Sequence, residues 1–349
     1  MPLLAELKAF LRAHAVVCLL LLSPGIPEYL SGSSPVNALV LNPAQFAFQL
    51  VANLGMYGPG VLLVREAKIR WNKGLATVLL LGAAYGILEE GIALSTLFNP
   101  EASPVGTLGI YGHWLGVNWI WAASIVPVHM IFSITLPILL LGLALPKTRE
   151  ERFLGGRKLW LAMILLGVDI AALFVLVTKE EQFWMGWPVF VGSWAAIGVL
   201  VLAARWVPFG ALVASRELPR VGAVVAALIG VVFYPAVLLS EFVPAAIGIP
   251  PGADFIIVLA VQGGFLACIL RILGKRGNQR VMLALGLGLI APIATFGVIA
   301  ERALPMTLLG DAAAVLFFMK VWRMYPPNGE ARMGQESAKM NAEGPAVEA

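Results

Sequence analysis

The chain has 349 residues, of which 60% are hydrophobic and 13% charged, with a net charge of +4 and a mean hydropathy of +0.87. Soluble domains contain about 45–50% apolar and about 25% charged residues. This composition excludes a soluble globular enzyme, a disordered protein and a nucleic-acid-binding protein, and it requires apolar segments that cross a bilayer. We therefore expect an all-α, multi-pass protein of the cell membrane (plasma or inner membrane), with the lipid bilayer as its main partner.

Ten apolar segments approach the length of a membrane-spanning helix, which is about 20 residues. In chain order they cover residues 13–30, 45–64, 75–97, 122–145, 159–177, 187–204, 221–243, 253–270, 281–300 and 306–321. The first is the least regular, because Pro24 and Pro27 interrupt it and Glu28 lies near its end. We expect a single transmembrane helical domain over residues 1–324 and a disordered cytoplasmic tail over residues 325–349.

The basic residues indicate the orientation. Of the 24 Lys and Arg residues, 22 lie at the amino terminus, in the even-numbered loops and in the tail, and only Lys179 and Arg302 lie in odd-numbered loops. Cytoplasmic loops carry the excess of Lys and Arg, so both termini should be cytoplasmic. Removal of the first apolar stretch as a signal peptide stays open, because the stretch has the right length but no clean cleavage site.

Acidic residues inside the predicted spans are the most informative polar groups. An ionised side chain near the bilayer centre costs about 2.5–3.5 kcal/mol on insertion scales. No Lys or Arg lies deep in a predicted span, so each acid must be protonated, hydrated, bound to a cation or paired with a histidine. The acids are Glu89, Glu90, Asp169 and Asp311. Glu241 and Asp254 lie near span ends, where we expect water or headgroups to reach them.

Glu89 and Glu90 form an adjacent pair on the third predicted span. Neighbouring side chains on a helix point about 100° apart. Glu90 follows Gly82 and Gly86 at four-residue spacing, which predicts that it faces a closely packed helix and not lipid. Glu89 lies four residues after Tyr85 on another face. Two acids this close can share a proton and serve as a general acid or base.

His129 lies on the fourth predicted span at a matching depth. Both Glu90 and His129 lie seven residues from the predicted outer ends of their helices, or about 10 Å at 1.5 Å per residue. Antiparallel packing of the two helices would therefore bring the three side chains together. Asn118 and Ser133 share the helical face of His129, so we include them as candidate binding residues.

A family resemblance supports this region. The segment YGILEEGIAL around Glu89 and Glu90, followed by His129 in the next span, resembles the glutamate intramembrane proteases, which include CAAX-prenyl proteases and bacteriocin-processing enzymes. The resemblance implies that one glutamate activates a water and that the histidine binds this water or stabilises the oxyanion. The sequence departs from the family pattern at Leu94, where the family has arginine, at Ile125, where it has phenylalanine, and in having no histidine after His129.

Three functions remain open. The first is an intramembrane hydrolase with a peptide or small-molecule substrate, in which Glu89, Glu90 and His129 are catalytic. The second is a secondary transporter coupled to protons or cations through the intramembrane acids. The third is a non-catalytic membrane scaffold. The sequence names no cofactor, metal site or oligomeric state. The candidate binding residues are Tyr85, Asn118, Ser133, Asp169 and Asp311.

Overall fold

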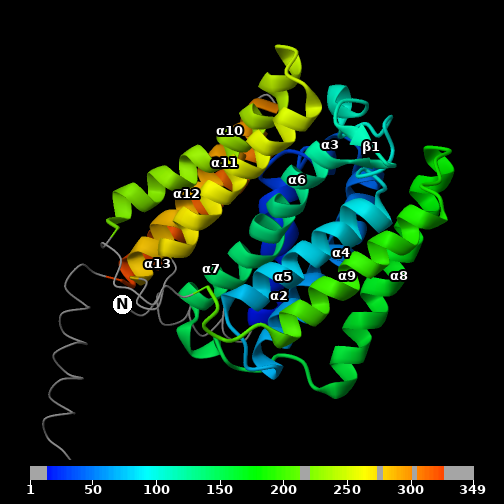
Figure 1. Cartoon of the computed structure of the whole chain (residues 1–349). Coiled ribbons are helices and arrows are strands. Elements are labelled where there is room, and N and C mark those ends of the chain that lie inside the picture. The colour runs from blue at the N-terminus through cyan, green and yellow to red at the C-terminus, as the bar shows by residue number, and fades with distance from the viewer. Residues whose placement is uncertain (1–13, 213–220, 273–277, 301–304, 326–349) are drawn as a thin grey trace, which may run out of the picture.

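The computed structural model describes residues 14–212, 221–272, 278–300 and 305–325. Within these ranges every regular element is a helix apart from one two-stranded hairpin, which confirms the all-α class (Figure 1). The helices are α2 (Ala15–Pro24), α3 (Ala38–Leu41), α4 (Pro43–Arg70), α5 (Leu75–Gly86), α6 (Trp119–Val128), α7 (Leu136–Ala144), α8 (Gly156–Glu180), α9 (Trp187–Trp206), α10 (Ala223–Ala246), α11 (Pro251–Ile272), α12 (Gln279–Ala300) and α13 (Pro305–Arg323). Three segments are π-helical: η1 (Gly25–Tyr29), η2 (Ile87–Ala93) and η4 (His129–Thr135).

Each of the ten apolar segments corresponds to a helix, and eight of the described helices are long and apolar enough to cross a membrane. The first, Ala15–Tyr29, is shorter, and α13 is not among the eight. A multi-pass membrane protein is therefore supported. The count of ten spans and the cytoplasmic location of both termini remain predictions. The tail predicted to be disordered lies, from residue 326 onward, outside the described residues.

The helices form three groups in Figure 1. Helices α10 to α13 lie together on one side, α8 and α9 lie on the other, and α2 and α4 to α7 lie between them. In the most apolar window of each span, 72% of the residues of α5–η2 are buried, against 11% for α8 and 11% for α9. The central helices are therefore shielded from lipid by their neighbours, as polar side chains inside a membrane require.

Two glycines of α5 explain why this helix approaches α6 and η4 so closely. A Cβ atom at Gly86 would lie 3.1 Å from the carbonyl oxygen of Val126, and one at Gly82 would lie 3.1 Å from the Cα of Met130. Small residues at a helix interface permit such close contact of backbones. The predicted stripe of Gly82, Gly86 and Glu90 therefore faces α6 and η4, and Glu90 is 6% exposed.

The chain between η2 and α6 forms a cap over one end of these helices. It contains η3 (Gly106–Leu108) and the antiparallel hairpin of β1 (His113–Trp114) and β2 (Val117–Asn118). Asn118 begins α6: its Oδ1 accepts the Trp121 amide at 3.0 Å, and its Nδ2 donates to the Leu108 carbonyl at 2.6 Å. Asn118 thus caps the helix and ties the cap to it.

Candidate functional site

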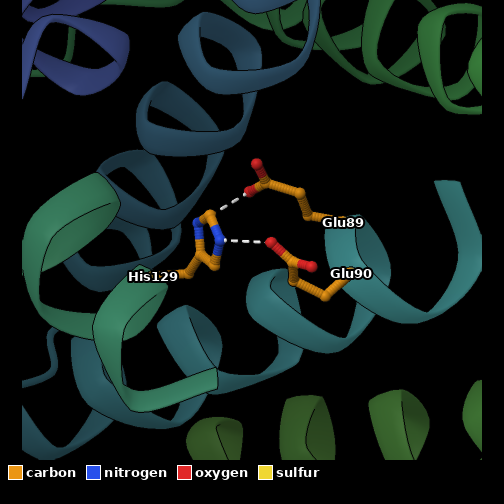
Figure 2. Close-up of side chains that lie close together, drawn as sticks. All are labelled: Glu89, Glu90 and His129. Carbon is orange, nitrogen blue, oxygen red and sulfur yellow. Dashed lines mark hydrogen bonds and ion pairs between the residues drawn. The ribbon is translucent and has the colours of Figure 1, made fainter. Parts of the chain in front are cut away.

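Three ionisable side chains, two from η2 and one from η4, meet in the protein interior (Figure 2). The Nε2 atom of His129 lies 2.7 Å from Oε1 of Glu90, and its Nδ1 atom lies 3.0 Å from Oε2 of Glu89. His129 is 4% exposed, Glu90 is 6% exposed and Glu89 is 1% exposed. One imidazole ring is therefore held between two carboxylates that come from adjacent positions of the neighbouring helix.

The backbone that carries this cluster is π-helical on both sides. Glu89 and Glu90 lie in η2, and His129 is the first residue of η4. The Leu94 amide donates to the Glu89 carbonyl five residues earlier, at 2.9 Å, which is the π-helical pattern. Short π-helical insertions within α-helices are frequent at functional sites. Figure 2 shows that both glutamate side chains point toward the ring from this segment.

A proline that follows η4 removes one α-helical hydrogen bond. Pro137 has no amide hydrogen, so the carbonyl of Ser133, four residues earlier, lacks its α-helical partner. Ser23 from α2 donates its hydroxyl to this carbonyl at 2.6 Å. The helix that carries His129 is thereby tied to α2.

Glu90 is anchored from the cap. Thr96 donates its hydroxyl to Oε2 of Glu90, and the indole of Trp121 donates to the same hydroxyl oxygen at 3.2 Å. Because Oε1 of Glu90 contacts His129, both carboxylate oxygens have partners. Glu90 therefore has one fixed position relative to the ring.

Glu89 is held less firmly. The Nδ1 atom of His129 forms its hydrogen bond with Oγ of Ser133 at 3.0 Å. Oε2 of Glu89 is buried and has no hydrogen-bond partner among the described residues, so its contact with Nδ1 lies off the hydrogen-bond direction. The buried hydroxyl of Tyr85 lies beside the Glu89 carboxylate, but no well-aligned hydrogen bond joins them within the described ranges. Glu89 is therefore the carboxylate with lone pairs available to a small polar molecule.

A third carboxylate, which sequence reasoning did not assign to the site, lies beside the cluster. Glu28 from η1 accepts the Tyr57 hydroxyl at 2.6 Å and the Ser34 hydroxyl at 3.0 Å. The ring of Tyr57 is 6.2 Å from that of His129 and 6.0 Å from that of Tyr85, measured between centroids. Glu28 is partly exposed whereas Tyr57 is 1% exposed. The pair thus connects the buried cluster to the rim of the helix bundle.

The remaining predicted residues separate into two sets. Ser133 bonds the histidine, and Tyr85 packs against Tyr57 at the same site. Asp169 lies on α8 against α4, close enough that a Cβ at Gly55 would lie 2.5 Å from its Oδ1 atom. Asp311 lies on α13. Asn118, Asp169 and Asp311 form no hydrogen bond or ion pair with Glu89, Glu90 or His129 in the part of the chain that the structure describes.

The cluster also has the composition of a metal site. One ligand atom from each of Glu89, Glu90 and His129 can be chosen so that all lie within 4.8 Å of one another. Here, however, the carboxylates approach opposite nitrogens of the ring. A single ion binds only one of these nitrogens, so one carboxylate contact would have to break. The arrangement as it stands fits proton exchange better than metal binding.

Charge balance supports the same interpretation. Neither arginine nor lysine contributes to the cluster's ion pairs among the described residues. A protonated imidazole between two ionised carboxylates leaves one net negative charge in a poorly polarisable interior, which is costly. One further proton neutralises the group. A proton added to such closely coupled groups belongs to the cluster as a whole and not to one residue.

Comparison with protein-family models, curated proteins and solved structures found no match for this chain. The geometry of the site is therefore the main guide to its function.

Proposed function

We propose that this integral membrane protein is an intramembrane hydrolase that cleaves amide bonds at the site formed by Glu89, Glu90 and His129. The observation that carries the proposal is the imidazole ring with a carboxylate oxygen within 3.0 Å of each nitrogen, inside the helix bundle. General acid–base catalysis requires partners about 2.6–3.2 Å apart. The resemblance of this segment to glutamate intramembrane proteases supports the same reaction class.

Each of the three side chains has its own role in the proposed reaction. Glu89, whose Oε2 has no hydrogen-bond partner among the described residues, takes a proton from a water molecule as the water oxygen attacks the substrate carbonyl carbon. The Nδ1–H group of His129 exchanges its Ser133 acceptor for the resulting oxyanion and donates a hydrogen bond to it. Glu90 keeps the ring in position through Nε2. Glu89 then transfers its proton to the leaving nitrogen, the C–N bond breaks, and a carboxylic acid and an amine are released.

Burial limits when this reaction can occur. The side chains of Glu89 and His129 are 1% and 5% exposed, so water and substrate reach them only when the surrounding helices or the cap move apart. Exclusion of bulk water strengthens the electrostatic interactions in the closed state. We expect opening of the cap to precede each turnover.

The test uses the purified full-length chain in liposomes with a panel of single-span peptides in heavy-oxygen water. Mass spectrometry should find one heavy oxygen atom in the new carboxyl terminus of a cleaved peptide. We expect Glu89→Gln to lower the rate by about 10²–10⁴-fold, the usual contribution of a general base. The matched control is Glu101→Gln, an exposed acid of the cap. Cleavage by Glu89→Gln at the wild-type rate, or no cleavage by the wild type, contradicts the proposal.

A transporter that uses all four predicted intramembrane acids has less support. Glu89 and Glu90 lie together, but Asp169 and Asp311 lie on α8 and α13, in the groups on opposite sides of the central helices. A scaffold needs none of these groups ionisable, and absence of cleavage by the wild type would favour it.

A further inference from the structure

A second pair of buried carboxylates lies at the capped end of the bundle. Glu241 is five residues before the end of α10 at Ala246, and Asp254 is three residues after the start of α11 at Pro251. The short 247–250 turn joins the two helices, so the two acids lie at similar depth on neighbouring, mutually packed helices. Their exposed fractions are 3% and 0%. The sequence had predicted contact with water or headgroups, and burial between helices overturns this.

This pair lacks the partners that buried carboxylates normally have. Both carboxylate oxygens of Asp254 are buried without a hydrogen-bond partner in the described part of the chain. The hydroxyl of Tyr111 lies beside Asp254, but it donates to the Ile249 carbonyl at 2.8 Å. Burying an ionised carboxylate without compensation is expensive. An ionised Asp254 would therefore be stabilised by a positively charged partner.

Helix α6 contributes a further oxygen atom beside this pair of carboxylates. Ser124 on α6 is 1% exposed, its hydroxyl has no hydrogen-bond partner among the described residues, and it lies beside the Glu241 carboxylate. Helix α6 packs against both α10 and α11. Pro244 in α10 has no amide hydrogen, which leaves the Ser240 carbonyl, next to Glu241, without a helical donor. The junction of three helices thus gathers oxygen atoms only.

We propose that Glu241, Asp254 and Ser124 form a second site, which binds one Ca²⁺ ion between α6, α10 and α11. Two carboxylates balance a divalent charge, and the absence of histidine and cysteine from this donor set disfavours zinc. Ca²⁺ takes six to eight oxygen ligands, including carbonyls and waters, in flexible geometry, whereas Mg²⁺ demands a near-ideal octahedron. The bound ion would fasten the α10–α11 hairpin to the helix that leads into His129.

The experiment titrates CaCl₂ into the purified full-length chain in detergent after removal of metal with EDTA. Calorimetry should find one saturable site per chain, and the melting temperature should rise with CaCl₂ but not with equal charge from choline chloride. We expect MgCl₂ to act only at much higher concentration. Glu241→Gln and Asp254→Asn should abolish the response. Glu89→Gln and Glu90→Gln should retain it, which separates this site from the proposed hydrolase site.

Two readouts keep the result interpretable. Without metal, each amide variant should melt at least as high as the wild type, because it removes an uncompensated buried charge. If an amide variant fails to fold, Ser124→Ala replaces it and should weaken the Ca²⁺ affinity several-fold without changing charge. Absence of saturable binding to the wild type, or unchanged binding to both Ser124→Ala and the double variant Glu241→Gln/Asp254→Asn, overturns the proposal.

Discussion

Replacement of Gly86 by alanine tests how the site is assembled. The new Cβ would lie 3.1 Å from the Val126 carbonyl oxygen, 3.2 Å from the Val126 Cα and 3.4 Å from the His129 Cβ. The first two distances are shorter than ordinary van der Waals contact, and both involve backbone, so α6 must move away by a few tenths of an ångström. Overpacking of this kind costs about 1–3 kcal/mol.

The chain offers a matched control for this substitution. Gly167 on α8 would place its Cβ in open space, with no atom within 4 Å. Both substitutions gain the higher helix propensity of alanine, worth about 1 kcal/mol. The difference between Gly86→Ala and Gly167→Ala therefore isolates the packing cost, and we expect Gly86→Ala to be less stable by about 1–3 kcal/mol.

The assay measures the free energy of unfolding of each variant in detergent micelles and then the hydrolytic rate. A difference of about 1.4 kcal/mol is a tenfold change in the unfolding equilibrium, well within reach of such measurements. Displacement of His129 should also lower the rate, because small misplacements of catalytic groups are costly. Equal stability of Gly86→Ala and Gly167→Ala would refute the close-packing argument.

Three further results are expected. Thr96→Val removes the hydroxyl that anchors Glu90, so the rate should fall while peptide binding is retained; an unchanged rate would show that this anchor is dispensable. Tyr57→Phe removes the 2.6 Å hydrogen bond to Glu28 and should destabilise the fold by about 1.5–3 kcal/mol, measured by unfolding, whereas a neutral effect would contradict a charge-assisted hydrogen bond. Burial, with a nearby carboxylate, raises the pKa of Tyr111 to about 12, so the tyrosinate difference spectrum against Tyr111→Phe should titrate there, and not near 10. Because the raised pKa favours the neutral phenol, its stabilising contribution is complete below pH 10 and is lost as the pH rises to about 12.

The contact between His129 and the two glutamates was within reach of sequence reasoning. Depth along two successive antiparallel helices is fixed by residue count, and Gly82 and Gly86 mark the face where the helices meet. These are local properties of neighbouring segments. The long helices of the described residues were located from runs of about 20 apolar residues, because hydropathy and length determine which segments cross a membrane.

Other parts of the site depend on contacts between distant segments. The Glu28–Tyr57 pair joins α4 to a segment 29 residues earlier, and Trp121 reaches Thr96 across the cap. No periodicity encodes such pairings. The interrupting prolines near Glu28 were the one available signal. The capping role of Asn118 was missed for a related reason: a shared helical face does not reveal that a residue caps the first turn.

Glu89 and Glu90 are joined by a single peptide bond, whereas His129 belongs to a different helix. The Cα atoms of the two glutamates are thus held together by covalent structure, whereas the ring reaches them only through the packing of η4 against η2. A shift of η4 against η2 therefore changes the contact of the ring with both carboxylates at the same time. The two contacts are coupled in this way, and a movement that reaches one of them reaches the other.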